Sequence, residues 1–155
     1  MSPLETPTHP ATHAKLTSQA AETFVLAGNA IFTLVSLKTG ARYTYRVRMA
    51  EPEPGKPSTW FVSLLTGPDN TGDYQYIGII DSSRTFRRTR KSKLSETSLP
   101  VVAFRWVYEK LAAHLDPPNV EIWHAGRCGR CGRTLTVPES IQLGLGPECA
   151  SKGVF

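Results

Sequence analysis

The sequence contains no long apolar run, and this absence sets the first limit on the protein. No stretch approaches the roughly 18 to 20 apolar residues that a membrane-spanning helix needs. The opening MSPLETPTHPATHAKLTSQ also lacks the basic start and apolar stretch of a secretory signal peptide. These absences predict a cytoplasmic protein without a membrane partner.

Cysteine is scarce, and the three present all fall late in the chain, at Cys128, Cys131 and Cys149. A secreted disulfide framework normally uses an even number of cysteines. Clustered thiols in a reducing compartment are more often metal ligands than disulfides. The scarcity therefore argues against a disulfide scaffold and favours a metal site.

Catalytic signatures are absent as well. The sequence has no H-E-x-x-H, P-loop or G-x-S-x-G motif. Zinc deaminases carry H-x-E before P-C-x-x-C, but here no H-x-E and no adjacent proline precede Cys128. Glu139 and Glu148 lie near the cysteines without a recognisable partner. A catalytic zinc with an open position for water is an alternative, but we expect a protein that is not an enzyme and has no catalytic residues.

The composition of the 155 residues is that of a soluble globular protein, with 40% apolar and 20% charged residues, enough to bury a core. The length fits one domain or one small domain with an appendage. The net charge of +5 favours a polyanionic partner such as nucleic acid.

Three segments differ in composition. Residues 1–22 are rich in Pro, Thr, Ala and Ser without a sustained period, and we expect a flexible leader. Residues 23–119 alternate and repeat as strands and a helix do, which predicts an α+β domain. Residues 120–155 contain the cysteines and form a predicted zinc-binding tail.

Residues 30–93 predict an antiparallel meander of four or five strands. IFTLVSLKTGARYTYRVRM indicates a hairpin with glycine in its turn, at Gly40. In the second arm, an apolar set alternates with Arg42, Thr44, Arg46 and Arg48, so one face should be basic and solvent-exposed. TWFVSLLT and YQYIGIID predict two more strands, and SRTFRRTRKSKL a possible fifth.

After residue 98 the period changes to that of a helix. Val101, Phe104, Tyr108, Leu111 and Leu115 recur at steps of three and four, and Pro100 suits a first helical turn. The prolines at 117 and 118 end the pattern. The predicted fold is therefore an antiparallel meander with one packed amphipathic helix and a C-terminal zinc knuckle or ribbon.

The cysteine spacing predicts a structural Zn²⁺ site. Cys128 and Cys131 form a C-x-x-C, whose spacing lets two sulfurs reach one ion, and Cys149 supplies a third. His124 is the best candidate for the fourth ligand, because neutral imidazole binds zinc well. His114 is an alternative at the predicted end of the helix.

Two other interpretations of the cysteines stay open. A C-x-x-C is a redox pair in thioredoxin-like proteins, but there it begins a helix after a strand in a βαβ unit, which this sequence does not predict. The thiols could also be buried and inert. The zinc site accounts best for the third cysteine.

The segment CGRCGRTLTVPESIQLGLGPEC resembles the DUF6011-like zinc-finger family of uncharacterised phage and bacterial proteins. The resemblance rests on C-x-x-C-G-R-x-L-T-x-P-x-S followed by G-x-G-P-x-C, and every element of that pattern is present. It implies a phage or prophage source, the cytoplasm of a bacterial host as location, and a zinc-bound tail. It implies no activity, since the function of the family is not established.

Positive charge is concentrated near residue 90, with six basic residues in ten and no acid among them: Arg84, Arg87, Arg88, Arg90, Lys91 and Lys93. Arg127 and Arg130 add charge beside the cysteines, where guanidinium groups could also offset a thiolate-bound zinc. A convergent set could follow a phosphate backbone. Aromatic residues could stack on bases: Tyr43, Tyr45, Trp60, Tyr74, Tyr76 and Phe86.

The sequence thus predicts a small, non-enzymatic, zinc-containing accessory protein. Its most favoured partner is nucleic acid, single-stranded or bound without sequence preference, contacted by the basic run and the arginines of the zinc knuckle. The alternative partner is a host protein, for instance a defence or replication factor, which the knuckle and the exposed part of the helix would bind and block.

Overall fold

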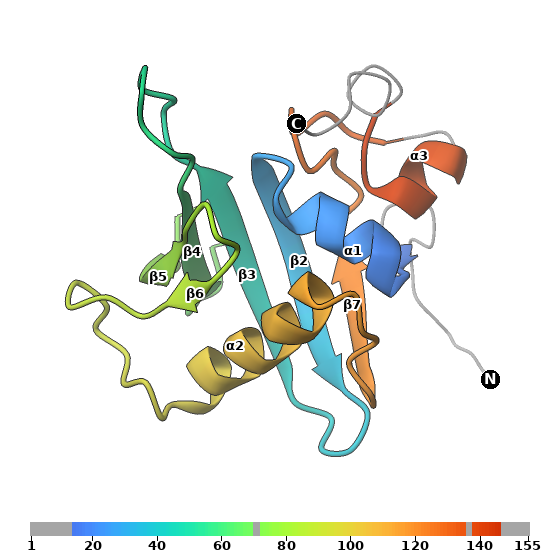
Figure 1. Cartoon of the computed structure of the whole chain (residues 1–155). Coiled ribbons are helices and arrows are strands. Elements are labelled where there is room, and N and C mark those ends of the chain that lie inside the picture. Colours follow the sequence, from blue (N-terminus) through green and yellow to red (C-terminus); the bar gives the residue numbers. More distant parts are fainter. Residues whose placement is uncertain (1–13, 70–71, 136–137, 147–155) are drawn as a thin grey trace.

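The fold is α+β and is built on one seven-stranded antiparallel sheet (Figure 1). The computed structural model describes residues 14–69, 72–135 and 138–146. The order of strands across the sheet is β1-β7-β2-β3-β4-β5-β6. The strands are β1 (Ala14–Leu16), β2 (Asn29–Ser36), β3 (Arg42–Met49), β4 (Trp60–Leu65), β5 (Tyr74–Ile80), β6 (Phe86–Arg87) and β7 (Val120–His124).

The predicted meander is confirmed as the centre of this sheet. Strands β2, β3, β4 and β5 pair with one another in chain order. The β2–β3 hairpin turns at Gly40, whose φ of 76° is unfavourable for residues with a Cβ atom. Along β3, Tyr45 and Val47 are buried while Arg42 and Arg48 are exposed, so the predicted basic face exists.

The predicted number of four or five strands is too low. β7 inserts beside β2 and pairs with β1 on its other side, which extends the sheet beyond the meander. β1 has only three residues and β7 only five, too short to show a clear alternation in sequence. The possible fifth strand is the two-residue β6.

The prediction of a flexible leader over residues 1–22 is wrong for its last part. Residues 14–16 form β1, and the helix α1 (Ser18–Val25) follows directly. The Thr17 hydroxyl caps α1 by accepting from the Ala20 N–H at 3.2 Å. Burial of Ala21, Phe24 and Val25 along one face of α1 stabilises the short helix. Residues 1–13 lie outside the described residues.

The predicted amphipathic helix is α2 (Leu99–Ala112). Its buried face includes Val101, Phe104, Tyr108 and Leu111, as the spacing indicated. The prediction fails at Leu115, which is 52% exposed because the helix has already ended and the chain turns through His114 at a φ of 60°.

An aromatic cluster joins α2 to the sheet. The Phe104 ring lies 4.9 Å from the ring of Phe86 and 5.1 Å from that of Tyr45, measured between centroids. It also stacks on Tyr108, with a 5.9 Å separation. The Tyr45 hydroxyl donates to the Pro100 carbonyl at 2.6 Å, which fixes the start of α2 against β3.

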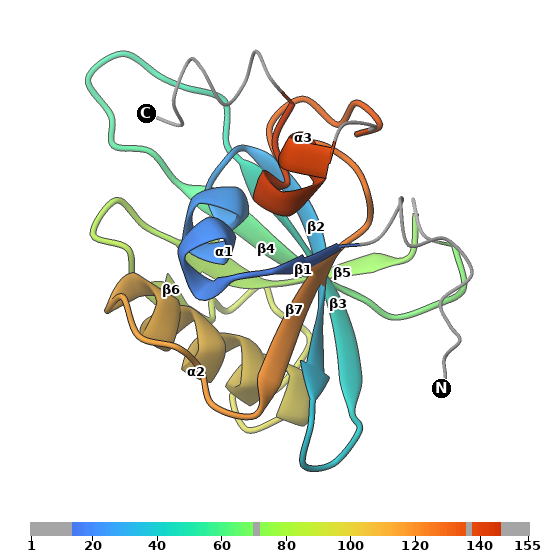
Figure 2. The same ribbon diagram turned by 90° about the vertical axis from the view of Figure 1, so that its right-hand side faces the viewer.

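Both longer helices lie on the same face of the sheet (Figure 2). Side chains that point toward them, such as Val47 and Val62, are fully buried. In the part of the chain that the structure describes, no helix lies on the opposite face. No described helix is long and apolar enough to span a bilayer.

Candidate functional site

The cysteine segment begins where β7 ends, at His124, and forms a tight loop. The Cys128 N–H donates to the Arg133 carbonyl at 2.8 Å, and the Gly132 N–H donates to the Cys128 carbonyl at 2.9 Å. An isolated antiparallel bridge pairs Arg127 with Thr134. The loop therefore has a compact backbone, and the zinc site expected from the C-x-x-C spacing stays a prediction.

The Cys128 thiol is buried and surrounded by backbone donors. The Arg130 N–H lies 3.4 Å from Cys128 Sγ. Burial alone would raise the pKa of this thiol, but hydrogen bonds from the backbone N–H groups of Cys131, Gly146 and Arg130, with a further one from the Cys131 side chain, lower it from 9.0 to about 7. These donors favour the thiolate, which is the form that binds zinc.

Of the other two predicted cysteine ligands, Cys131 alone lies among the described residues. Cys131 is exposed, close to Cys128, and both thiols are free. Cys149 lies outside the described residues. Within residues 14–69, 72–135 and 138–146, no group of three or more His, Cys, Asp or Glu side chains is placed to hold a metal ion.

His124 is buried, with only 1% of its surface exposed, and both ring nitrogens have hydrogen-bond partners. Nδ1 accepts from the Gly126 N–H at 2.9 Å, which leaves Nε2 protonated and donating to the Ile141 carbonyl at 2.5 Å. To bind zinc, His124 would have to exchange one of these partners for the metal. His124 as the fourth ligand stays a prediction.

Phe24 of α1 anchors the cysteine segment to the sheet domain. A Cβ atom added at Gly129 would lie 2.6 Å from Phe24 Cδ1, and one added at Gly144 would lie 2.4 Å from the same atom. The Phe24 ring also packs beside His124, with 5.6 Å between centroids. Only glycine permits so close an approach at these two positions.

Backbone hydrogen bonds reinforce this contact. The Gly129 N–H donates to the Gly144 carbonyl at 2.7 Å, and the Asn29 N–H at the start of β2 donates to the Gly129 carbonyl at 2.6 Å. The helix α3 (Pro138–Leu143) ends beside them and lies next to α1 (Figure 1). The segment therefore packs against the sheet domain.

The compact segment that follows β7 coincides with the region of family resemblance. Residues 124–152 match the family of unknown function DUF6011. The comparison confirms the resemblance and assigns no activity to the DUF6011 segment. Comparisons with curated proteins and with solved structures gave no match.

Three members of the basic run have local structural partners. Arg84 Nη1 lies 2.9 Å from Glu22 Oε2, and Arg87 Nε lies 3.3 Å from Asp81 Oδ2. Arg88 donates to the carbonyls of Leu94 and Ser92, at 2.6 and 3.0 Å. Arg88 therefore shapes the loop after β6, and Arg84 ties the β5–β6 turn to α1.

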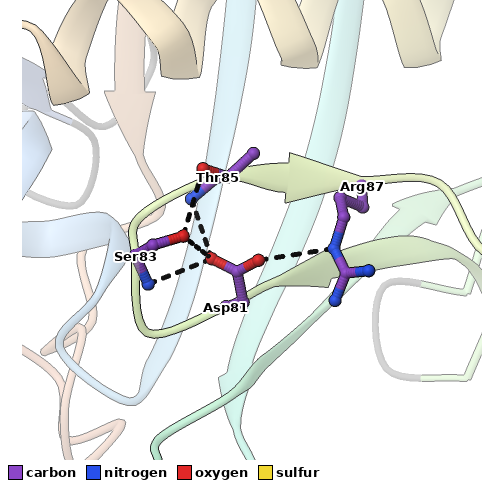
Figure 3. Close-up of polar contacts among 4 residues, drawn as sticks. All are labelled: Asp81, Ser83, Thr85 and Arg87. Atoms are coloured by element: carbon purple, nitrogen blue, oxygen red, sulfur yellow. Dashed lines mark hydrogen bonds and ion pairs between the residues drawn. The ribbon is translucent and has the colours of Figure 1, made fainter.

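The β5–β6 turn is organised around Asp81 (Figure 3). Its Oδ1 accepts from the N–H groups of Ser83 and Thr85, at 3.0 and 3.2 Å, and from the Ser83 hydroxyl at 2.6 Å. The Ser83 hydroxyl is the largest cause of a lowered pKa at Asp81; burial opposes it, and the two backbone donors and Arg87 lower the pKa further. A carboxylate held this firmly positions Arg87 on the outer side of the hairpin.

The remaining basic residues are exposed. Arg90, Lys91 and Lys93 project from the β6–α2 loop, and among the described residues none of them has an ion-pair partner. In the DUF6011 segment, Arg127 is exposed and its Nη1 donates to the Gly132 carbonyl at 3.3 Å, while the Arg130 side chain is exposed beside Cys128.

The predicted stacking residues separate into two groups, apart from Tyr43, which is partly buried and packs against the core. Tyr45, Trp60 and Phe86 are buried on the helix side of the sheet, so they cannot stack on a ligand. Tyr74 and Tyr76 are half-buried in β5. The prediction missed Phe61, a 45% exposed ring on β4. Its alternation with the buried Trp60 and Val62 in WFVSLL was the signal that could have identified it.

Proposed function

We propose that this protein is a non-enzymatic nucleic-acid-binding protein, an accessory protein of the phage or prophage type, whose DUF6011 segment is stabilised by zinc. The observation that carries the nucleic-acid proposal is the β6–α2 loop. There, Arg90, Lys91 and Lys93 are exposed and have no acidic partner among the residues described. Such groups can each neutralise a phosphate and release a counterion.

The loop also has a framework that supports this role. Arg88 holds its backbone through the carbonyls of Ser92 and Leu94. The Ser92 hydroxyl is buried and bonded to the Leu94 carbonyl at 3.1 Å. The three free cations therefore project from a fixed loop, which lowers the entropy lost when they meet a phosphate chain.

Fluorescence anisotropy with labelled single-stranded DNA, duplex DNA and RNA tests this function. We expect micromolar or tighter binding whose logarithm falls linearly with the logarithm of salt concentration. Replacing Arg90, Lys91 and Lys93 together by Glu should weaken binding and flatten that slope. The control Lys38→Glu, in the exposed β2–β3 turn, should change the affinity and the slope little. Absence of binding to all three probes at low salt would refute the function.

Zinc is proposed as a structural ion held by Cys128, Cys131 and Cys149, with His124 as the candidate fourth ligand. The lowered pKa of Cys128, to about 7, and the donors around its sulfur fit a thiolate ligand. With a neutral histidine the site would carry a net negative charge, which Arg127 and Arg130 beside it can offset. The ion would supply folding free energy to the segment.

Metal analysis of the purified protein tests the zinc proposal. We expect one zinc per chain, lost in Cys128→Ser, Cys131→Ser and Cys149→Ser. His124→Ala separates the two roles of the histidine: retained zinc with lowered thermal stability would show that its hydrogen bonds matter and that another group completes the site. A metal-free wild-type protein that folds normally in the presence of zinc would refute the proposal.

A second candidate function, binding to a host protein as inhibitor or adaptor, is favoured by one surface of α2. Leu99, Val102 and Trp106 are 71%, 44% and 38% exposed at steps of three and four along the helix, which places them on one face. Co-purification of a single host protein that Trp106→Glu abolishes would support this function over nucleic-acid binding.

A further inference from the structure

The face of the sheet opposite the helices carries an aromatic and basic surface formed by β3, β4 and β5. Strand register places Arg48 of β3 beside Phe61 of β4, and Phe61 beside Ile79 of β5. Ile79 in turn pairs with Arg87 of β6. Because paired residues point to the same side of a sheet, these four side chains form one row across four strands.

A second row lies beside the first. Arg46 pairs with Ser63, and Ser63 with Tyr76. Tyr76 meets Phe61 edge to face, with 6.3 Å between ring centroids and 67° between the planes. The Arg46 guanidinium lies 4.3 Å from the ring centroid of Tyr74, in cation–π contact. Phe61 is therefore supported at its side while 45% of its surface faces solvent.

The charge of this surface has one sign. The sequences of β3, β4 and β5 contain three arginines, all in β3, and no Asp or Glu. Three carboxylates of the described residues have partners of their own: Asp81 pairs with Arg87 at the edge of the row, Asp73 accepts from the Asp69 N–H, and Glu121 pairs with Lys15. Burial, and then the nearby charge of Arg48, lower the pKa of Arg46, with Tyr74 acting in the opposite direction, so the two cations lie close enough to repel each other.

An anion would relieve this crowding, and an exposed ring between cations suits a planar, apolar partner as well. A single-stranded nucleic acid offers both, because its bases are free to stack and its phosphates follow at regular intervals. A duplex offers phosphates only, since its base faces are already stacked. An acidic peptide would match the charge but would leave the exposed ring without a stacking partner.

We propose that the open face of β3, β4 and β5 binds single-stranded nucleic acid, with a base stacked on Phe61 and the adjacent phosphates held by Arg46 and Arg48. This inference rests on the proposed nucleic-acid function and names its platform. The strand then continues past Arg87 at the edge of the sheet toward the β6–α2 loop, where Arg90, Lys91 and Lys93 contact further phosphates.

Anisotropy titration with fluorescein-labelled oligothymidylate and oligouridylate, each of about 20 nucleotides, and with a DNA duplex of the same length tests the platform. We expect the wild-type protein to bind the single strands more tightly than the duplex. Phe61→Ala should weaken single-strand binding about tenfold, the effect of losing one stacked base, and leave duplex binding unchanged. Phe61→Trp should retain the affinity.

Two matched controls distinguish the platform from a general effect. Trp106→Ala removes an exposed ring from α2, on the other side of the sheet, and should not alter binding. Arg48→Gln should weaken binding and reduce the salt slope by about one unit, whereas Lys38→Gln should not. Since Phe61 and Arg48 are exposed, thermal melting should confirm that both variants are folded.

The outcomes separate this inference from the function on which it rests. If the wild-type protein binds none of the three probes, both are overturned. If it binds, but Phe61→Ala and Arg48→Gln bind as tightly as wild type, only the platform is overturned and the loop charges account for the affinity. Equal affinity for single strands and duplex would also overturn the platform.

Discussion

Cys128 combines burial with an unusual number of backbone donors, and this makes its ionisation a property of the folded loop. Unfolding would remove the N–H groups of Arg130, Cys131 and Gly146 and return the thiol to its ordinary pKa of 9.0. The thiolate therefore stabilises the fold fully above that ordinary value. The contribution is lost as the pH falls through about 7, the pKa in the fold.

A pH titration of the metal-free protein, followed by the ultraviolet absorbance of the thiolate, measures this effect. We expect one thiol to ionise near pH 7, as the lowered pKa of Cys128 requires. Cys128→Ser should abolish that step. Cys131→Ala should move it upward, because the Cys131 side chain contributes one of the stabilising hydrogen bonds. A first ionisation near the ordinary value would contradict the geometry of the loop.

Tyr108 carries the one buried side-chain polar atom without a hydrogen-bond partner among the described residues. Burial raises the pKa of its hydroxyl to about 12, so the group stays neutral and unsatisfied. Tyr108→Phe should increase the free energy of unfolding by about 1 kcal/mol, because it removes the desolvated group and keeps the ring.

Tyr45→Phe is the matched control, since the Tyr45 hydroxyl donates to the Pro100 carbonyl at 2.6 Å. The free energy of unfolding of Tyr45→Phe should instead be lower than that of the wild type by about 1 kcal/mol. Urea denaturation of the two variants and the wild type gives both values. A loss of stability in Tyr108→Phe would show that its hydroxyl has a partner in solution.

At the scale of elements, the contact between α1 and the DUF6011 segment depends on the absence of two side chains. Gly144 has a φ of 73° and meets the Phe24 ring. Gly144→Ala should lower the free energy of unfolding by about 2 kcal/mol, because the added methyl group strains the backbone and displaces Phe24. Thermal or urea denaturation measures the loss.

Gly146→Ala provides the control for that substitution. A Cβ atom at Gly146 would meet nothing within 4 Å, and an alanine there keeps the N–H that bonds to Cys128. Its stability should stay close to that of the wild type. If the double variant Gly144→Ala, Phe24→Leu is more stable than Gly144→Ala alone, the Phe24 ring is the source of the clash.

The elements that were predictable from sequence are those whose signal is local and long enough to repeat. β2 and β3 each have eight residues, and α2 has fourteen, so alternation and helical spacing are visible. β1 and β7 are short, and their formation depends on pairing with strands distant in the chain: β7 with β2 and β1 with β7. α1 was hidden in a leader-like composition, although Thr17 before Ser18 is a standard capping signal.

The candidate site divides in the same way. The Cys128–Cys131 loop follows from local spacing and was predictable. Its attachment to Phe24 was not, because no sequence pattern relates Gly129 and Gly144 to a residue so distant in the chain. Likewise, the sequence could not show that Arg84 has a structural role, since its partner Glu22 lies 62 residues away.

For the molecule as a whole, the DUF6011 segment is part of the fold and not a separate module. Ending the chain after Ala125 would uncover Phe24, whose burial is worth about 2 kcal/mol, and remove the Asn29–Gly129 hydrogen bond. We expect the shortened protein to melt at a lower temperature and to bind a hydrophobic dye. Differential scanning calorimetry should still show one transition in the full chain.

A chain ended after Gly146 separates packing from metal binding. It keeps the contacts of Gly129 and Gly144 with Phe24 but loses Cys149. If zinc is structural, this chain should lose its metal and melt between the wild type and the chain ended after Ala125. Equal stability of the two shortened chains would show that the packing on Phe24 contributes nothing without residues 147–155.

The pairing of β1 with β7 fixes when the fold can be completed during synthesis. Ala14 lies opposite His124, and among the described strands β1 pairs with β7 alone. A ribosome that adds about 5 to 20 residues per second releases β1 on the order of ten seconds before its partner. The meander can assemble in that interval, while the first strand stays unpaired. Translation thus closes the sheet last at its β1–β7 edge.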